Sequence, residues 1–244
     1  MEAAIRKTGA LFEKDLKDVV KNPTMLVCCL LPIGFMLFYK NAMGGGMEGA
    51  EGEAFSQMLV SWSLMFSATM IASMATLTAI AEEKEKNTLR TLTLANVSAE
   101  QILASRGLVT LLAIGLVDAA CYFVLGQPAS GLPAFLAIGI LGSVPIVLVS
   151  LLLGLAARDQ MSAGVLSVPV LVLGIGPMFA QMVDGLADIA PYLPTGGMNE
   201  LGLLVAQGNL FTSDALAPVV VTLAWIAVAA VAFALLYKRL SRDN

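Results

Sequence analysis

The side chains that could perform acid–base, metal or nucleophilic chemistry are few in this chain. It contains no histidine, which excludes His-Glu-x-x-His zinc chemistry, Ser-His-Asp triads and Cys-His dyads. Cys28, Cys29 and Cys121 all lie in apolar runs, and their spacing is typical of neither a metal site nor a structural disulfide. Asp118 lies in another apolar run and lacks the second carboxylate that aspartyl chemistry requires. We therefore expect that the chain is not an enzyme and binds no metal or cofactor itself.

Four polar residues inside apolar runs are candidates for lining a transport path. Thr69, Ser73 and Thr76 fall at i, i+4 and i+7 and so form one polar stripe on a helix. Such hydroxyls either bond within and between helices or line a path, and both interpretations stay open. Asp118 would cost about 2.5 to 3.5 kcal/mol at the centre of a membrane helix, so it should face protein or water. Its role is either a structural hydrogen bond or a part of the path.

The densest charge between apolar runs lies in residues 82–106. Glu82 precedes Lys86 by four residues, the favourable order for an ion pair on a helix. After a corner, Ser98 followed by Gln101 is a capping-box pattern that predicts a second helix. The segment is therefore predicted to form a helix, a tight corner and another helix.

Composition places these residues in a membrane protein. The chain has 244 residues, 58% hydrophobic and 13% charged, with a mean hydropathy of +0.83. Soluble domains carry about 25% charged residues. We expect an all-α integral membrane protein, a single permease domain over residues 1–244 with six transmembrane helices. The predicted spans are residues 24–39, 55–81, 102–125, 134–157, 163–182 and 218–237.

The segments between the spans have distinct patterns. Residues 2–21 place apolar side chains on one helical stripe, which predicts an amphipathic helix at the membrane interface. Residues 41–54 are rich in glycine and glutamate and predict a flexible acidic loop. Residues 82–101 form the charged loop described above. Residues 183–217 predict one or two short outer helices before the last span.

The distribution of basic residues predicts the orientation. Thirteen of the fourteen Lys and Arg residues lie before the first span, in the second-to-third loop or at its border with the third span, in the fourth-to-fifth loop, or after the last span. Lys40 is the exception, and the segments on its side of the membrane carry mainly acidic residues. An even number of spans puts both termini on one side, and the positive-inside rule makes that side cytoplasmic.

The charged loop and this layout together resemble the permeases of ATP-binding-cassette type 2 transporters. The resemblance covers the layout of the whole chain. Its departures are Asn87 where such permeases usually carry Gly, Asn96 where Pro is common, and Arg106 where Lys is frequent. Asn adopts the left-handed backbone readily and favours turns, so both Asn residues should preserve the local geometry. The matching motif residues are Glu82, Glu83, Glu85, Thr88, Leu89, Val97 and Ser98.

The resemblance implies a function and a set of partners. A separate ATPase dimer, which binds ATP and Mg, would dock on the coupling loop 82–101 of a permease in the plasma or inner membrane. A second permease subunit, identical or a sister chain, would complete the path in the lipid bilayer, and export is the usual direction. No nucleic acid partner is implied. The coupling residues would be Glu82, Glu83, Glu85, Thr88, Leu89, Leu92, Val97 and Ser98, of which Leu89, Leu92 and Val97 form an apolar patch.

Other classes fit less well. The chain has no Gly-x-x-x-x-Gly-Lys-Ser/Thr phosphate loop, so it cannot supply the ATPase itself. A secondary transporter or channel without an ATPase partner would usually carry more intramembrane charge than Asp118. An intramembrane enzyme would need catalytic groups that the sequence lacks. The substrate is left open between a peptide, a lipid, a drug and an ion.

Overall fold

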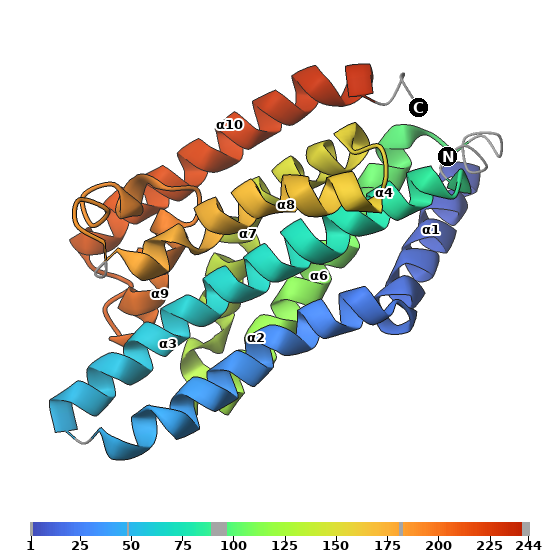
Figure 1. Cartoon of the computed structure of the whole chain (residues 1–244). Helices are drawn as coiled ribbons and strands as arrows, with labels where there is room; N and C mark the ends of the chain where they lie inside the picture. Colours follow the sequence, from blue (N-terminus) through green and yellow to red (C-terminus); the bar gives the residue numbers. More distant parts are fainter. Residues whose placement is uncertain (1, 48, 89–96, 181–182, 241–244) are drawn as a thin grey trace.

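The structure is a computed structural model that describes residues 2–47, 49–88, 97–180 and 183–240. For residues 2–8, 238 and 239 it describes the backbone only. Over these residues it is all-helical, without a strand (Figure 1). Six of the helical segments are long and apolar enough to cross a membrane: Pro23–Gly46, Gly49–Glu85, Ala99–Val124, Ala129–Ala156, Gln160–Phe179 and Ser213–Tyr237. The prediction of an all-α integral membrane protein is confirmed.

These segments form one bundle of helices. The first contains α2 (Pro23–Ala42), the second contains α3 (Gly49–Thr69) and α4 (Leu77–Glu85), and the third is α6 (Ala99–Val124). The fourth contains α7 (Leu132–Ala156), the fifth α8 (Gln160–Ile175) and the sixth α10 (Leu216–Leu240). Both chain termini lie at the same end of the bundle as α4, which we call the terminal end (Figure 1).

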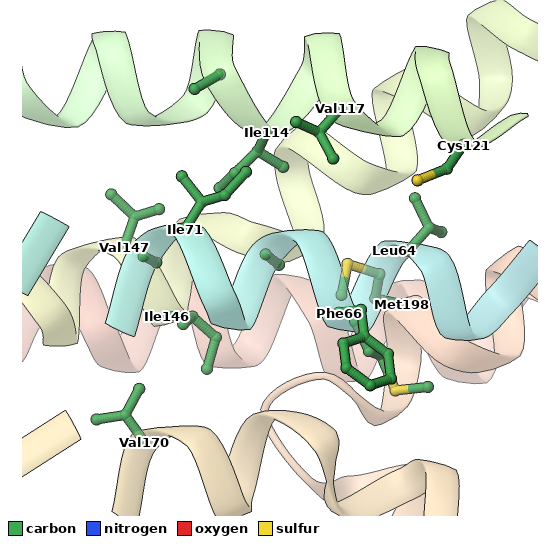
Figure 2. Packing of buried hydrophobic residues seen from close by; sticks show 14 of the residues in the cluster. Leu64, Phe66, Ile71, Ile114, Val117, Cys121, Ile146, Val147, Val170 and Met198 are labelled. Carbon is green, nitrogen blue, oxygen red and sulfur yellow. The ribbon is translucent and has the colours of Figure 1, made fainter. Parts of the chain in front are cut away.

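The second segment runs through the centre of the bundle. In Figure 2, Ile71 lies near Ile114 of α6 and Val147 of α7, and Leu64 lies near Cys121 of α6. By contrast, α2 and α10 leave most of their apolar surface exposed. Since lipid is as apolar as these side chains, exposed leucines and valines are the expected outer surface of a membrane bundle. The central position lets the second segment carry polar side chains without contact with lipid.

The first span and the segment after it differ from the prediction. Asn22 caps α2 by accepting hydrogen bonds from the backbone N–H groups of Thr24 and Met25, at 2.9 and 3.4 Å, with Pro23 at the first helical position. The helix then continues to Ala42, beyond the predicted end at residue 39. A 3-10 turn at Gly44–Gly46 follows, and α3 already begins at Gly49. The prediction of a flexible loop over residues 41–54 was wrong, because most of those residues extend the two helices.

A π-helical segment, Met70–Thr76, separates α3 from α4. A π-turn holds an extra residue compared with an α-turn, and such segments are rare. Two hydroxyls in it donate to backbone carbonyl oxygens of the same span: Ser73 to Thr69, the last residue of α3, at 2.5 Å, and Thr76 to Ile71 at 3.0 Å. The segment lies at the centre of the bundle, where it contacts α2, α6, α7 and α8.

The residues before the last span form short helices at the end opposite the terminal end. These are a 3-10 turn at Ala190–Tyr192, α9 (Gly196–Ala206) and a 3-10 turn at Ser213–Ala215. Hydrogen bonds fix them to the spans: Thr195 Oγ1 donates to the carbonyl oxygen of Gly174 at 2.7 Å, and Trp225 Nε1 donates to that of Tyr192 at 2.9 Å. α9 packs against α3, α7 and α10.

Candidate functional site

A buried guanidinium connects three helices at the terminal end. Arg106, in the second turn of α6, is only 2% exposed, although it is one of the largest side chains in the bundle. Its Nη2 donates to Glu83 Oε1 of α4 at 2.7 Å and lies 3.2 Å from Asp15 Oδ1 of α1 (Glu2–Lys21). A buried charge is stable only when it is paired, so this arrangement fixes the three helices relative to one another.

Lys14 supplies a second positive charge to the same cluster. Its Nζ lies 2.5 Å from Glu83 Oε1, 3.3 Å from Asp18 Oδ2 and 3.5 Å from Asp15 Oδ1. Burial lowers the pKa of Lys14, but the hydrogen bond and the charge of Glu83 outweigh it, so the pKa is raised overall. Lys14 is therefore fully charged at neutral pH. We call Lys14, Asp15, Asp18, Glu83 and Arg106 the charge cluster.

The charge cluster holds α1, α4 and α6 together. The hydroxyl of Ser105 also donates to Asp15 Oδ2 at 2.6 Å, which holds α1 on α6. The carboxylates of Asp15, Asp18 and Glu83 are close enough together for a cation, and Arg106 and Lys14 provide that positive charge. Nε and Nη1 of Arg106 and Oε2 of Glu83 are buried and have no hydrogen-bond partner among the described residues.

The beginning of the charged loop is tied to two other parts of the bundle. The predicted pair of Glu82 and Lys86 is confirmed, with Lys86 Nζ 2.5 Å from Glu82 Oε1, and it raises the pKa of Lys86. Asn22 Nδ2 donates to Glu82 Oε2 at 3.3 Å, and the backbone N–H of Gln160 donates to Glu85 Oε2 at 3.2 Å. Acidic residues predicted to face a partner are therefore also bonded within the chain.

The corner of the loop follows the predicted geometry where it is described. Asn87 has a φ of 56°, the left-handed conformation that the comparison with Gly predicted. The capping box at the start of α6 is confirmed, with Gln101 N donating to Ser98 Oγ at 3.2 Å and Ser98 N donating to Gln101 Oε1 at 3.1 Å. Thr88 is half-buried. Leu89 and Leu92 lie outside the described residues.

Val97 is only 8% exposed and packs with Leu11 of α1 and Ile102 of α6. The sequence left two interpretations of the apolar patch open, a contact with the ATPase and packing within the chain. In this structure Val97 packs within the chain. This contact also shows which side of α1 is buried. The buried side carries Leu11 and Asp15 against α6, while Val20, on the predicted apolar stripe, is 69% exposed.

The four path candidates are all fully buried inside the single chain. Thr76 Oγ1 lies 2.8 Å from Thr110 Oγ1 of α6, and Ser67 donates to Asp118. The second carboxylate oxygen of Asp118 and the hydroxyl of Thr69 have no hydrogen-bond partner among the described residues. Asp118 thus faces protein, as its cost in lipid requires. In this conformation Thr69, Ser73, Thr76 and Asp118 pack helices together and line no exposed surface.

The charge cluster is not apparent from the sequence alone. In the sequence, the charges of residues 2–21 are typical of the solvated side of an interfacial helix, and Arg106 is a variant of a motif position. A usable signal was present, because Asp15 follows Leu11 by four residues and so lies on the same side of the helix. An acidic residue aligned with an apolar one predicts a buried pair, but its partner on α6 could not be identified from spacing.

Comparison with known proteins identifies the family. The ABC-2 family transporter protein model matches residues 38–237. The match begins in the last part of the first span and covers the other five. A search of curated proteins found no match. The matched region contains Glu83 and Arg106, whereas α1 with Asp15 precedes it. With six candidate spans and a match over most of its length, the chain belongs to the ABC-2 family of transporter proteins and is a permease of the ABC-2 type.

Proposed function

We propose that this chain is the membrane-spanning subunit of an ATP-driven exporter and is coupled to a separate ATPase dimer through the loop 82–101. ATP and Mg bind to the ATPase, and the permease forms the translocation path together with a second permease subunit. The family supports transport in general. The basic residues of the termini and of the loop support a cytoplasmic position, where a soluble ATPase can reach them.

The observation that carries the proposal is the charge cluster. Glu83 lies at the end of the second span, four residues before Asn87 and the turn of the loop, and it pairs directly with Arg106 in the third span. A force applied to the loop therefore acts on two spans and on α1 at the same time. Because closely packed elements shift between discrete arrangements, such a connection can transmit a small displacement into the bundle.

We place the docking contact at the two leucines in the middle of the loop. Val97 is buried against Leu11, so we assign the apolar contact to Leu89 and Leu92, with Glu82, Glu85 and Thr88 at its edge and Ser98 as the cap of the helix beyond. Acidic side chains at such an edge steer and orient a basic partner more than they add affinity.

Replacing both leucines tests this assignment. Leu89→Asp together with Leu92→Asp removes apolar side chains that would each contribute up to about 1.5 to 3 kcal/mol when buried. We expect the variant to enter the membrane normally, to retain less than one tenth of the copurified ATPase and to lose transport. Phe211→Asp is the matched control, since Phe211 is 97% exposed at the opposite end of the bundle. It should leave copurification and transport unchanged.

The outcomes separate docking from folding. Val97 is left intact in this design because an aspartate there would disturb the contact between α1 and α6. Normal copurification and normal transport in the double variant would mean that the loop is not the coupling element. Loss of both in the Phe211→Asp control would show that the assay reports damage to the fold.

A further inference from the structure

An apolar groove runs along the outside of the bundle at its terminal end. α6 and α10 both pack along α7, and the groove lies between them with α7 as its floor. It has a volume of about 550 Å³, within the range of small-ligand sites. Leu103 and Leu111 line it from α6, Val147 and Leu151 from α7, and Phe233 from α10.

The polar end of the groove lies where the helices leave the apolar layer. Glu100, in the first turn of α6, accepts a hydrogen bond of 2.6 Å from the hydroxyl of Tyr237, near the end of α10. Both side chains belong to the groove lining, whereas the rest of the lining is apolar. Tyrosine at this level is typical of the boundary between headgroups and acyl chains.

The length of the groove corresponds to one leaflet of a bilayer. From Glu100 to Leu111 the helix rises about 17 Å at about 1.5 Å per residue, which is roughly half of the ~30 Å hydrocarbon core. The groove therefore starts at the membrane boundary and ends near the midplane. An acyl chain of the leaflet at the terminal end covers the same depth.

The composition of the lining favours an acyl chain over a helix of a second copy as the occupant. Helix pairs in membranes approach through small residues, whereas leucine, valine and phenylalanine make up most of the floor and walls of this groove, with Ala104, Gly107 and Ala234 as its small residues.

From these observations we infer that the groove between α6, α7 and α10 is a binding site for one acyl chain of a phospholipid from the leaflet at the terminal end. The Tyr237–Glu100 hydrogen bond closes the groove beside the headgroup. A lipid held there bridges α6, whose first turns carry Arg106, and α10, the last span. This site is separate from the docking surface of the loop, and its existence does not depend on the proposed coupling to an ATPase.

Filling the groove tests the inference. Ala104 and Ala234 line the groove and are exposed, so Ala104→Phe together with Ala234→Phe occupies it without entering the core. Ala227→Phe together with Ala230→Phe is the matched control, because both alanines are exposed on α10 outside the groove. Native mass spectrometry of the purified full chain, after the same detergent wash, counts the phospholipids that stay bound and identifies them by mass.

We expect one retained phospholipid per chain in the wild type and in the control, and at least a tenfold lower occupancy in the groove variant. Tyr237→Phe, which removes only a hydroxyl, should keep the lipid but exchange it at least threefold faster with added deuterated phospholipid. Equal occupancy in the groove variant and the control would overturn the inference. So would a groove variant that keeps its lipid but loses a second copy of the chain, since the occupant would then be protein.

Discussion

Arg106 shows how much of the architecture rests on a single side chain. A guanidinium that is 2% exposed is stable only while the carboxylates of Asp15 and Glu83 stay beside it. These carboxylates come from two other helices, α1 and α4, so the arginine helps to determine where both meet the third span. Both contacts are made by one nitrogen, Nη2, so a single group of the side chain joins the two helices to α6.

Removing the guanidinium should therefore be costly. We expect Arg106→Met to lower the free energy of unfolding by about 3 to 5 kcal/mol, because it leaves buried carboxylates without their partner. Lys17→Met is the matched control: Lys17 also pairs with a carboxylate, Glu13, at 2.6 Å, but both side chains are more than half exposed. Such pairs contribute about 0 to 1 kcal/mol. Chemical unfolding of the detergent-purified chain measures both changes, and equal losses would contradict a special role for Arg106.

Asp118 is buried within the third span, away from the charge cluster, and we expect a different result from its replacement. Its carboxyl accepts a hydrogen bond from Ser67 and lies against Gly139, where a Cβ would collide with it. Asp118→Asn keeps the shape and the oxygen that Ser67 bonds to, so the variant should fold and transport as the wild type does at every pH. Poor transport by a well-folded Asp118→Asn variant, measured in the same vesicles, would instead indicate a role for the charge in the path.

At the scale of the element, the π-helical segment Met70–Thr76 divides the second span into two parts. α3, which precedes it in the chain, forms the centre of the bundle, and α4, which follows it, carries Glu83 into the charge cluster. Because a π-turn can be converted into an α-turn by the loss of one residue, the segment can absorb a deletion that an α-helix cannot.

A pair of deletions makes this testable. Deleting Met74, a 37% exposed residue within the π-helical segment, should leave α3 and α4 in register and give a chain that still folds. Deleting Met65, within α3, rotates one part of the helix by about 100° relative to the other and should prevent folding. Thermal unfolding after purification compares the two variants. If both deletions are equally damaging, the π-helical segment is not a point of adjustable register.

At the scale of the whole molecule, the orientation in the membrane can be measured. Single cysteines at Gly45 and Phe211, both exposed at the end opposite the termini, should react with an impermeant thiol reagent in intact cells. A cysteine at Arg158, exposed at the terminal end, should react only after the membrane is opened, because the basic residues favour the cytoplasmic side. Cys28, Cys29 and Cys121 would be replaced first. Labelling at Arg158 from outside would reverse the orientation and remove the basis of the docking proposal.

The burial of the four path candidates limits where a transport path could run. Thr69, Ser73, Thr76 and Asp118 are buried in one chain, while the exposed helices α2, α8 and α10 present mainly apolar side chains. A path between two copies would thus need either a rearrangement that opens the centre of the bundle or a lining made of outward-facing residues. The charge cluster, with its unpaired buried atoms, lies at the end where such a rearrangement would start.

The sequence by itself determined the elements of this protein. Hydropathy over about 20 residues predicts a membrane span because a bilayer has a fixed thickness and leaves no water for an unpaired backbone. Local patterns were equally reliable where they depend on neighbours in the chain, as with the Ser98–Gln101 capping box, the Glu82–Lys86 pair and the left-handed Asn87. In each case the interacting atoms are at most four residues apart.

Only the tertiary structure decided which residues meet across helices. Asp15 and Arg106 are ninety-one positions apart in the chain, and Val97 turned inward because Leu11 happens to lie opposite it. The groove between α6 and α10 is likewise a product of packing. Periodicity states which side of a helix is polar or apolar, but the partner of that side is set by how the helices cross, and no spacing within one helix contains that information.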